Sequence, residues 1–136
     1  MPIIGDPVAH VRAPFFFNPK FDSMGLDAFL FPLHVPAAAL ADVVPQLARC
    51  PNVKGLIVTI PHKETMARLC HELGPDGKLM GAVNTVRFGP EGHLAGDMFD
   101  GLGLVAAVRA AGLEPRGRAV LLIGAGGAGR ASAFAM

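Results

Sequence analysis

The sequence has no long hydrophobic run, almost no net charge and only two cysteines. Its apolar stretches are interrupted by proline, glycine or charged residues and fall well short of the roughly 20 residues that a membrane-spanning helix needs. No charged segment precedes an apolar one as in a secretory signal peptide, so we expect a cytoplasmic protein with no membrane partner. Cys50 and Cys70 are too few for a disulfide framework or a zinc site, and we expect both to be small buried residues.

The charged residues are 12 Lys and Arg against 11 Asp and Glu, scattered singly along the chain. This balance leaves no basic stripe for nucleic acid, so we expect small-molecule partners. With 136 residues, 51% of them apolar, the chain can build one domain, or one domain and a piece of another. Four histidines lack metal-ligand spacing: His34, His62, His71 and His93. We therefore expect no metal, and we interpret each of the four as solvated or locally hydrogen-bonded.

Strand and helix patterns alternate along the chain. We expect strands at 3–4, 28–33 and 56–58, followed in turn by helices at 13–24, 37–48 and 61–73. Segments 82–88 and 93–96 flank a four-residue loop and predict an antiparallel hairpin at the sheet edge. The alternation predicts an α/β fold with an open, mixed, mostly parallel sheet and helices on both faces.

The central stretch of the sequence is 55–64, Gly-Leu-Ile-Val-Thr-Ile-Pro-His-Lys-Glu. Its apolar, β-branched start predicts a buried strand, and Pro61 suits the first position of a helix. Lys63 is therefore expected in the first helical turn, just past the carboxyl end of a strand, where ligands bind in open α/β sheets. A lysine there faces the positive end of the helix dipole, which disfavours its charge and suggests a functional role. A surface lysine whose side chain extends over the helix is the alternative.

A glycine-rich motif follows the apolar segment 119–123, which is expected to be a strand. Such a G-x-G-x-x-G pattern between a strand and a helix is typical of dinucleotide binding, although a tight turn alone is the alternative. The expected cofactor-binding residues are Gly124, Ala125, Gly126, Gly127 and Gly129. The residue that would distinguish NAD from NADP lies about 20 positions further on, beyond Met136.

Because the strand at 119–123 and its helix lack the sheet they would complete, we expect exposed apolar surface there. The sequence therefore predicts that this chain forms a two-fold homodimer through residues 119–136, by association or exchange of that segment.

Five polar residues fall at predicted strand ends or helix starts on one side of the sheet: His10, Thr59, Lys63, Asn84 and Asp100. If Lys63 and Asp100 meet, each favours the ionised form of the other. A lysine so placed can pass a proton to or from an oxygen during hydride transfer between a carbonyl and a nicotinamide. A surface ion pair is the alternative.

Four blocks together with the glycine loop resemble the shikimate dehydrogenases and quinate/shikimate dehydrogenases over essentially the whole chain. The blocks are Gly5-Asp6-Pro7-Val8-Ala9-His10, Thr59-Ile60-Pro61-His62-Lys63, Gly81-Ala82-Val83-Asn84-Thr85 and Asp100-Gly101. The resemblance implies a substrate-binding domain at 1–100, a connecting helix and linker at 101–118, and the start of a Rossmann domain at 119–136. It implies an oxidoreductase acting on a shikimate- or quinate-like hydroxy acid, usually with NADP. Lys63 and Asp100 would be the catalytic pair, and Thr59 and Asn84 would bind substrate hydroxyls. The fragment itself is expected to be inactive.

One departure concerns the substrate carboxylate. The family normally places two serines where this chain has Val11 and Ala13, so Arg12 is the candidate replacement. Ile57 likewise stands for the usual asparagine, and Met98-Phe99 for Asn-Thr. Losing such partners costs roughly 1 to 3 kcal/mol each, so we expect altered substrate choice. The alternative is a non-catalytic paralogue that binds a small molecule.

Overall fold

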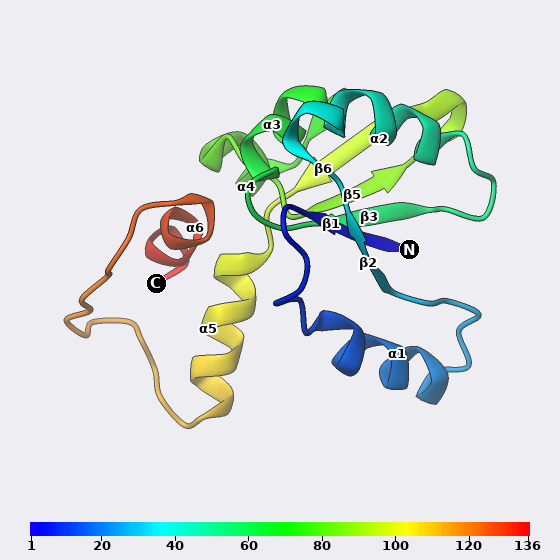
Figure 1. The fold of residues 1–136 in the computed structure, drawn as a ribbon. Helices are drawn as coiled ribbons and strands as arrows, with labels where there is room; N and C mark the ends of the chain where they lie inside the picture. The colour runs from blue at the N-terminus through cyan, green and yellow to red at the C-terminus, as the bar shows by residue number, and fades with distance from the viewer.

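The structure is a computed structural model that describes residues 1–136. Six strands form one sheet in the order β2-β1-β3-β5-β6-β4 (Figure 1). Their bounds are β1 Pro2–Gly5, β2 Phe31–His34, β3 Gly55–Val58, β4 Glu72–Leu73, β5 Thr85–Phe88 and β6 Leu94–Asp97. The open, mixed, mostly parallel α/β sheet expected from the sequence is therefore present.

Strand β5 is the one strand that runs against its neighbours. It pairs antiparallel with both β3 and β6, whereas β1 pairs parallel with β2 and β3, and β4 pairs parallel with β6. The β5–β6 hairpin predicted at 82–96 is confirmed, but its predicted place at the sheet edge is wrong. Strands β3 and β4 flank it, and the edge strands of the sheet are β2 and β4. Pro32 is tolerated in β2 because that strand has a free edge.

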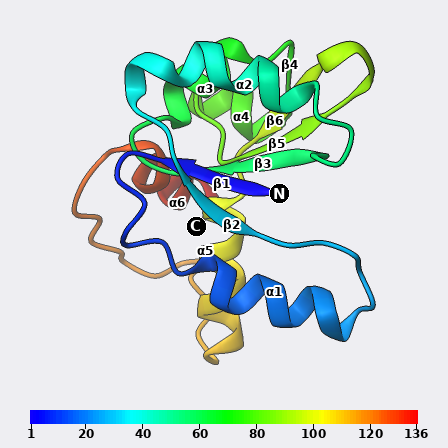
Figure 2. The same cartoon turned by 45° about the vertical axis from the view of Figure 1, so that its right-hand side comes forward.

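Six α-helices surround the sheet: α1 Ala13–Ser23, α2 Leu40–Ala48, α3 Lys63–Leu69, α4 Pro75–Met80, α5 Asp100–Ala110 and α6 Gly127–Ala135. Short 3₁₀ turns precede α2 at Ala37–Ala39 and β6 at Pro90–Gly92. Helices α2 and α3 cover one face of the sheet, and α1 and α5 lie on the other (Figures 1 and 2). No helix is both long enough and apolar enough to cross a membrane.

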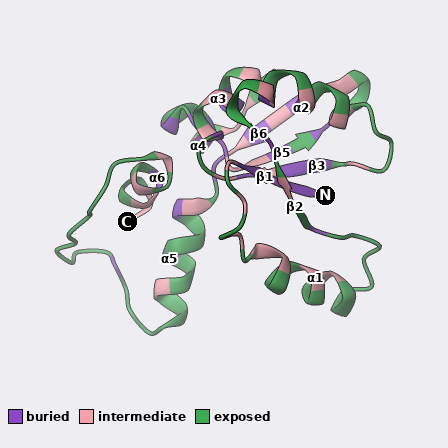
Figure 3. Cartoon of the chain, in the orientation of Figure 1, coloured by how far each residue is buried: buried purple, intermediate pink, exposed green.

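The main core lies between the sheet and helices α2 and α3. Twelve buried side chains form it, including Leu56 of β3, Val44 of α2 and Met66 of α3, which have no exposed surface. Burying one such side chain contributes about 1.5–3 kcal/mol. This layer fixes where β3 ends and α3 begins (Figure 3).

The helix predicted at 61–73 is shorter than expected. Pro61 lies in a turn, with His62 N–H donating to the Thr59 carbonyl over 3.0 Å, and α3 runs only from Lys63 to Leu69. The backbone becomes extended at Cys70, and strand β4 then pairs with β6. Helix α4 follows, with Pro75 at its start, and its Gly77 N–H donates to the Asp97 carboxylate over 2.6 Å.

The strand predicted at 119–123 does not form. The segment makes no sheet pairing, and Leu121 and Ile123 are 85% and 90% exposed. A strand needs neighbours for its backbone groups, and this chain supplies none there. The helix after the glycines does form, as α6, and it packs on α5 and α4 of the same chain. The exposed apolar surface expected here is present at Leu121, Ile123 and Phe134, whereas Ala131 of α6 is buried.

Both cysteines differ from the expectation of two buried residues. Cys50 is exposed, at the end of α2, and Cys70 is only partly buried. Desolvation raises the pKa of the Cys70 thiol to about 11. Cys70 therefore stays a neutral, poorly nucleophilic thiol near pH 7, because the thiolate is the reactive form.

Candidate active site

Lys63 and Asp100 meet at the carboxyl end of β3. Each is the first residue of its helix, Lys63 of α3 and Asp100 of α5. The Lys63 ammonium donates a short hydrogen bond to Asp100 Oδ2, and their side chains are 14% and 25% exposed. The contact that the sequence predicts is thus present, in a partly desolvated setting where an ion pair is screened less than on the surface.

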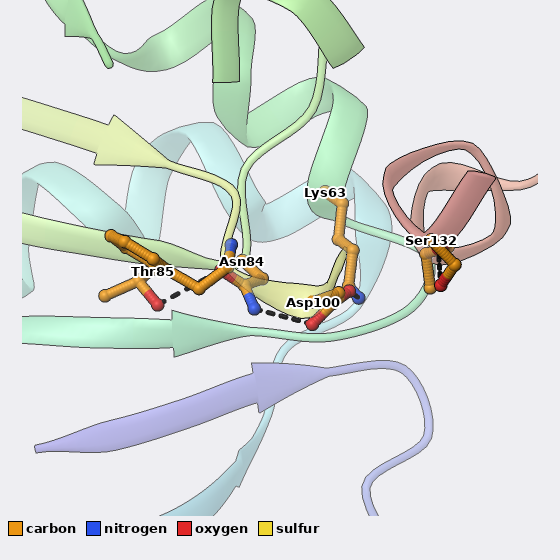
Figure 4. Close-up of polar contacts among 7 residues, drawn as sticks. Lys63, Asn84, Thr85, Asp100 and Ser132 are labelled. Atoms are coloured by element: carbon orange, nitrogen blue, oxygen red, sulfur yellow. Dashed lines mark hydrogen bonds and ion pairs between the residues drawn. The ribbon is translucent and has the colours of Figure 1, made fainter. Parts of the chain in front are cut away.

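Asn84 holds the other oxygen of Asp100. Its Nδ2 donates to Asp100 Oδ1 over 2.6 Å, while its Oδ1 accepts from the Phe99 N–H at 3.0 Å and from the Thr85 hydroxyl at 3.2 Å. Figure 4 shows these side chains turned toward one another from three elements. Asn84 therefore orients the carboxylate and also ties the start of α5 to the start of β5.

Backbone hydrogen bonds also fix the segment that carries Asn84. The Val83 N–H donates to the Lys63 carbonyl over 3.0 Å, and the Val58 N–H donates to the Asn84 carbonyl over 2.7 Å. Asn84 N–H in turn donates to the Asp97 carbonyl over 3.0 Å. These bonds tie the segment before β5 to the ends of β3 and β6 and to the start of α3, which carries Lys63.

The electrostatics explain why a lysine is tolerated at the start of α3. The positive helix end disfavours its ammonium, but the Asp100 carboxylate, itself favoured by the N-terminus of α5, lies against it. Lys63 Nζ has one protein acceptor and carries up to three hydrogens, so N–H groups remain for a ligand. The arrangement can hydrogen-bond a carbonyl or hydroxyl oxygen and exchange a proton with it.

The other residues predicted for the site make no hydrogen bond to the triad of Lys63, Asp100 and Asn84. Thr59 is partly buried, and its methyl group packs so closely over Gly5 that a Cβ there would lie 2.5 Å away. His10 is exposed and makes no hydrogen bond. Arg12 is also exposed and rests its guanidinium over the Phe15 ring at 5.9 Å.

Val11 and Ala13, at the start of α1, are partly buried. No hydrogen bond or ion pair connects the 11–13 segment to Lys63 or Asp100.

The glycine loop lies beside Lys63. A pocket lined by Ile60, Pro61, Lys63 and Glu64 on one side is closed on the other by residues 126–129. Gly124 has φ +101°, and a Cβ at Gly129 would lie 2.5 Å from the Gly124 carbonyl oxygen, so the turn needs glycine at both positions. Ala125 lies between them, and the space around Gly126 is open.

The start of α6 has free donors. Its first internal hydrogen bond runs from the Arg130 N–H to the Gly126 carbonyl, so the N–H groups of 127–129 have no acceptor within the helix. Free N–H groups, an open glycine approach and the helix dipole are what a pyrophosphate requires. The loop therefore fits a dinucleotide.

The expectation that His62 is solvated or locally hydrogen-bonded is wrong. His62 is buried, and its Nε2 shares a 2.7 Å hydrogen bond with the Val35 carbonyl, 27 residues away. It fixes the residue just before Lys63, and only its place beside the lysine could have signalled this. No cluster of histidine, cysteine or carboxylate side chains could hold a metal.

Comparison with known proteins decides the family. The model of the shikimate dehydrogenase substrate binding domain matches residues 3–86. The chain belongs to the shikimate dehydrogenase family.

Family members resemble the chain along nearly its whole length. It is 44% identical to a shikimate dehydrogenase (NADP(+)) of Geobacter sp. strain M21, over 96% of this chain and 44% of that protein. Identity to the Rubrobacter xylanophilus enzyme of the same name is 42%, over 98% of this chain and 47% of the relative. The chain thus spans about half the length of the curated relatives it matches.

Solved structures of the family agree with the fold. A Thermus thermophilus shikimate 5-dehydrogenase in complex with shikimate superposes with a TM-score of 0.90 at 36% identity, covering 98% of this chain and 50% of the other. The same enzyme with NADP(H) and shikimate gives 0.89 at 36% identity, with the same coverage. The matched family domain contains Lys63 and Asn84, and Asp100 lies beyond it.

Proposed function

We propose that this chain is the substrate-binding half of an NADP-dependent oxidoreductase that interconverts a 3-dehydroshikimate-like ketone and a shikimate- or quinate-like hydroxy acid. The observation that carries the proposal is the Lys63–Asp100–Asn84 triad beside a glycine loop. Membership of the family supports it, as do the relatives' names, which specify NADP(+).

Lys63 handles the proton in this proposal. The bound cofactor would supply the hydride for ketone reduction in its reduced form, NADPH, and would accept it in the reverse direction as NADP+. The Lys63 ammonium hydrogen-bonds the substrate carbonyl oxygen and gives it a proton during reduction. In the oxidation direction the neutral amine takes the hydroxyl proton.

Asp100 holds the Lys63 amine in place, and Asn84 fixes Asp100. Thr59 and the remaining N–H of Asn84 are proposed to bind substrate hydroxyls. Because this binding orients the reacting oxygen toward Lys63, it would contribute to rate as well as to affinity.

Substrate choice is proposed to differ from that of shikimate enzymes. Val11 and Ala13 offer no hydroxyl to a carboxylate, and Arg12 is engaged with Phe15. A ligand would have to draw Arg12 from that ring, or bind without a carboxylate contact. We therefore expect weak shikimate binding and better turnover of a hydroxy acid whose binding depends less on hydrogen bonds from residues 11–13 to its carboxylate.

A direct experiment is turnover by a form of the chain extended to the length of its relatives. We expect NADP reduction with a hydroxy acid from a screen that includes shikimate and quinate, and a weaker response with NAD. Substrate binding without any turnover would instead support the alternative, a non-catalytic paralogue. The lost carboxylate partners favour that alternative, whereas the intact triad opposes it.

Two structural expectations also stay proposals. One is the division into a substrate domain at 1–100, a connection at 101–118 and a cofactor segment at 119–136. The other is a homodimer of the 136-residue chain through residues 119–136, where Val120 to Ile123 offer exposed apolar surface. Sedimentation at micromolar concentration would test the dimer, and a monomer would refute it.

A further inference from the structure

The glycine loop is attached to the rest of the chain through α6. That helix packs on α5 through small residues, and a Cβ on Gly101 would lie 2.1 Å from the Ala131 carbonyl oxygen. Ala131 is buried, and Ala135 also lies close to Gly101. Small apolar contacts allow close approach but have little directionality. They do not by themselves fix how α6 is rotated on α5.

Arg130 makes the only hydrogen bonds between α6 and any other element. Its Nη2 donates to Glu64 Oε1 over 2.6 Å and to the Met80 carbonyl over 3.4 Å. Every other hydrogen bond of this helix is internal. The directional part of the docking therefore depends on one guanidinium.

Both partners stand next to the proposed reaction centre. Glu64 follows Lys63 on α3, and Arg130 follows the last glycine of the loop. The two residues are 66 positions apart, and Glu64 lines the pocket that Lys63 and the glycines also line. Across that pocket, a Cβ at Gly127 would lie 3.7 Å from Lys63 Cδ. Fixing Arg130 thus fixes the loop against the lysine stem.

The charges suit a contact across elements better than local helix stability. Arg130 lies in the first turn of α6, where the helix dipole disfavours a cation, whereas Glu64 lies in the first turn of α3, where it favours an anion. Glu64 offsets the unfavourable placement of Arg130. The contact with Glu64 therefore explains an arginine at position 130.

We infer that Glu64 and Arg130 are positioning residues that set the glycine loop at a fixed place and orientation relative to Lys63. The inference rests on the proposed function for its catalytic meaning, but not for its structural content. Loss of the pair would loosen the loop without removing any group that touches the reacting atoms. The expected consequence is a weaker cofactor interaction with the proton-transfer step retained.

Amide hydrogen exchange on the 136-residue chain tests the structural content. Glu64→Gln and Arg130→Gln should each speed exchange in 127–135 by about two- to fivefold, the range expected of a partly exposed ion pair, while 55–58 is unchanged. The double variant should exchange no faster than the faster single variant, since both lose the same contact. Glu114→Gln, which breaks the exposed Arg109–Glu114 pair, is the matched control and should leave 127–135 unchanged. Unchanged or additive rates would overturn the inference.

Kinetics of the extended protein test the catalytic meaning. Glu64→Gln should raise KM for NADP by about two- to fivefold, because the loosened loop binds the cofactor less tightly. Both kcat and its pH profile should stay close to those of the parent. A fall in kcat with unchanged KM would contradict the positioning role. If the exchange result holds but the unsubstituted extended protein turns over no substrate, the proposed function fails and the structural inference stands.

Discussion

The two faces of the sheet are buried very differently. The face beneath α2 and α3 contains the main core, with Leu56, Val58 and Met66 almost wholly excluded from solvent. On the other face, α1 has no buried residue, and its phenylalanines Phe15 and Phe16 are largely exposed. The Asn18 side chain holds this helix, donating to the Leu30 carbonyl and accepting from its N–H.

This difference separates stability from recognition. The packed face sets the positions of β3 and α3, and hence of Lys63, while the open face carries Val11, Arg12 and Ala13 at the start of α1. Substitutions in the first region should change folding, and substitutions in the second should change binding. The exposed apolar side chains of α1 also form a surface that another part of a longer chain, or another molecule, could cover.

The strongest test of the comparison is a cavity in the packed face. Leu56→Ala should lower the free energy of unfolding by about 2–5 kcal/mol, because a wholly buried side chain is removed from the core. Urea unfolding of the 136-residue chain measures it. Leu121→Ala is the control, since that leucine is 85% exposed and should change little. Equal effects at the two sites would break the comparison.

Restoring hydroxyl donors on the open side should change binding and not folding. Val11→Ser combined with Ala13→Ser should strengthen shikimate binding by roughly 1 to 3 kcal/mol if the carboxylate site is otherwise intact. Calorimetry on the 136-residue chain measures the affinity, with Val11→Ala as a control that adds no hydroxyl. Unchanged affinity, together with loss of binding in Arg12→Ala, would assign the carboxylate to Arg12 instead.

A smaller, pH-dependent effect is expected where β1 and β2 end. The hydrogen bond from His34 lowers the pKa of the Asp6 carboxyl below its usual value near 3.8, and the Ala37 N–H adds to it. Because the folded pKa is depressed, the carboxylate stabilises the fold above the unfolded pKa, and this contribution is lost as pH falls through the folded pKa.

Asp6→Asn should therefore be less stable than the parent at pH 6, and the gap should close below about pH 4. Thermal unfolding followed across that range measures it. A gap that stays constant with pH would show that the carboxylate charge is not involved.

The smallest effect is expected on α1. Phe16 is 74% exposed, so Phe16→Ser should change the free energy of unfolding of the chain by no more than about 0.5 kcal/mol. Urea unfolding checks this value. A loss of several kcal/mol would mean that a second molecule covers α1 in solution, and it would depend on protein concentration.

Local patterns in the sequence sufficed where neighbours in the chain decide the structure. Lys63 after a buried strand, Asp100 at a helix start and the glycines before α6 could be located in this way, and their convergence followed from the parallel sheet rule. Helix α4 was not predicted, although Pro75 suits the first turn of a helix.

Contacts between distant segments could not be predicted in this way. A two-residue strand such as β4 has no periodicity, and it exists because β6 lies beside it. Residues 119–123 have strand composition but lack a neighbouring strand, so composition alone gave the wrong answer. The His62–Val35 and Glu64–Arg130 contacts involve common residue types 27 and 66 positions apart, with no spacing signal.

Replacing Lys63 in the extended protein tests the central claim, that the lysine held by Asp100 transfers the proton in a hydride-transfer reaction. Lys63→Ala should lower kcat by about 10² or more, the usual contribution of general acid–base catalysis, with substrate binding and the unfolding midpoint retained. Lys78→Ala, which removes an exposed lysine of α4, should leave kcat unchanged. Turnover by Lys63→Ala equal to that of the parent would contradict the account.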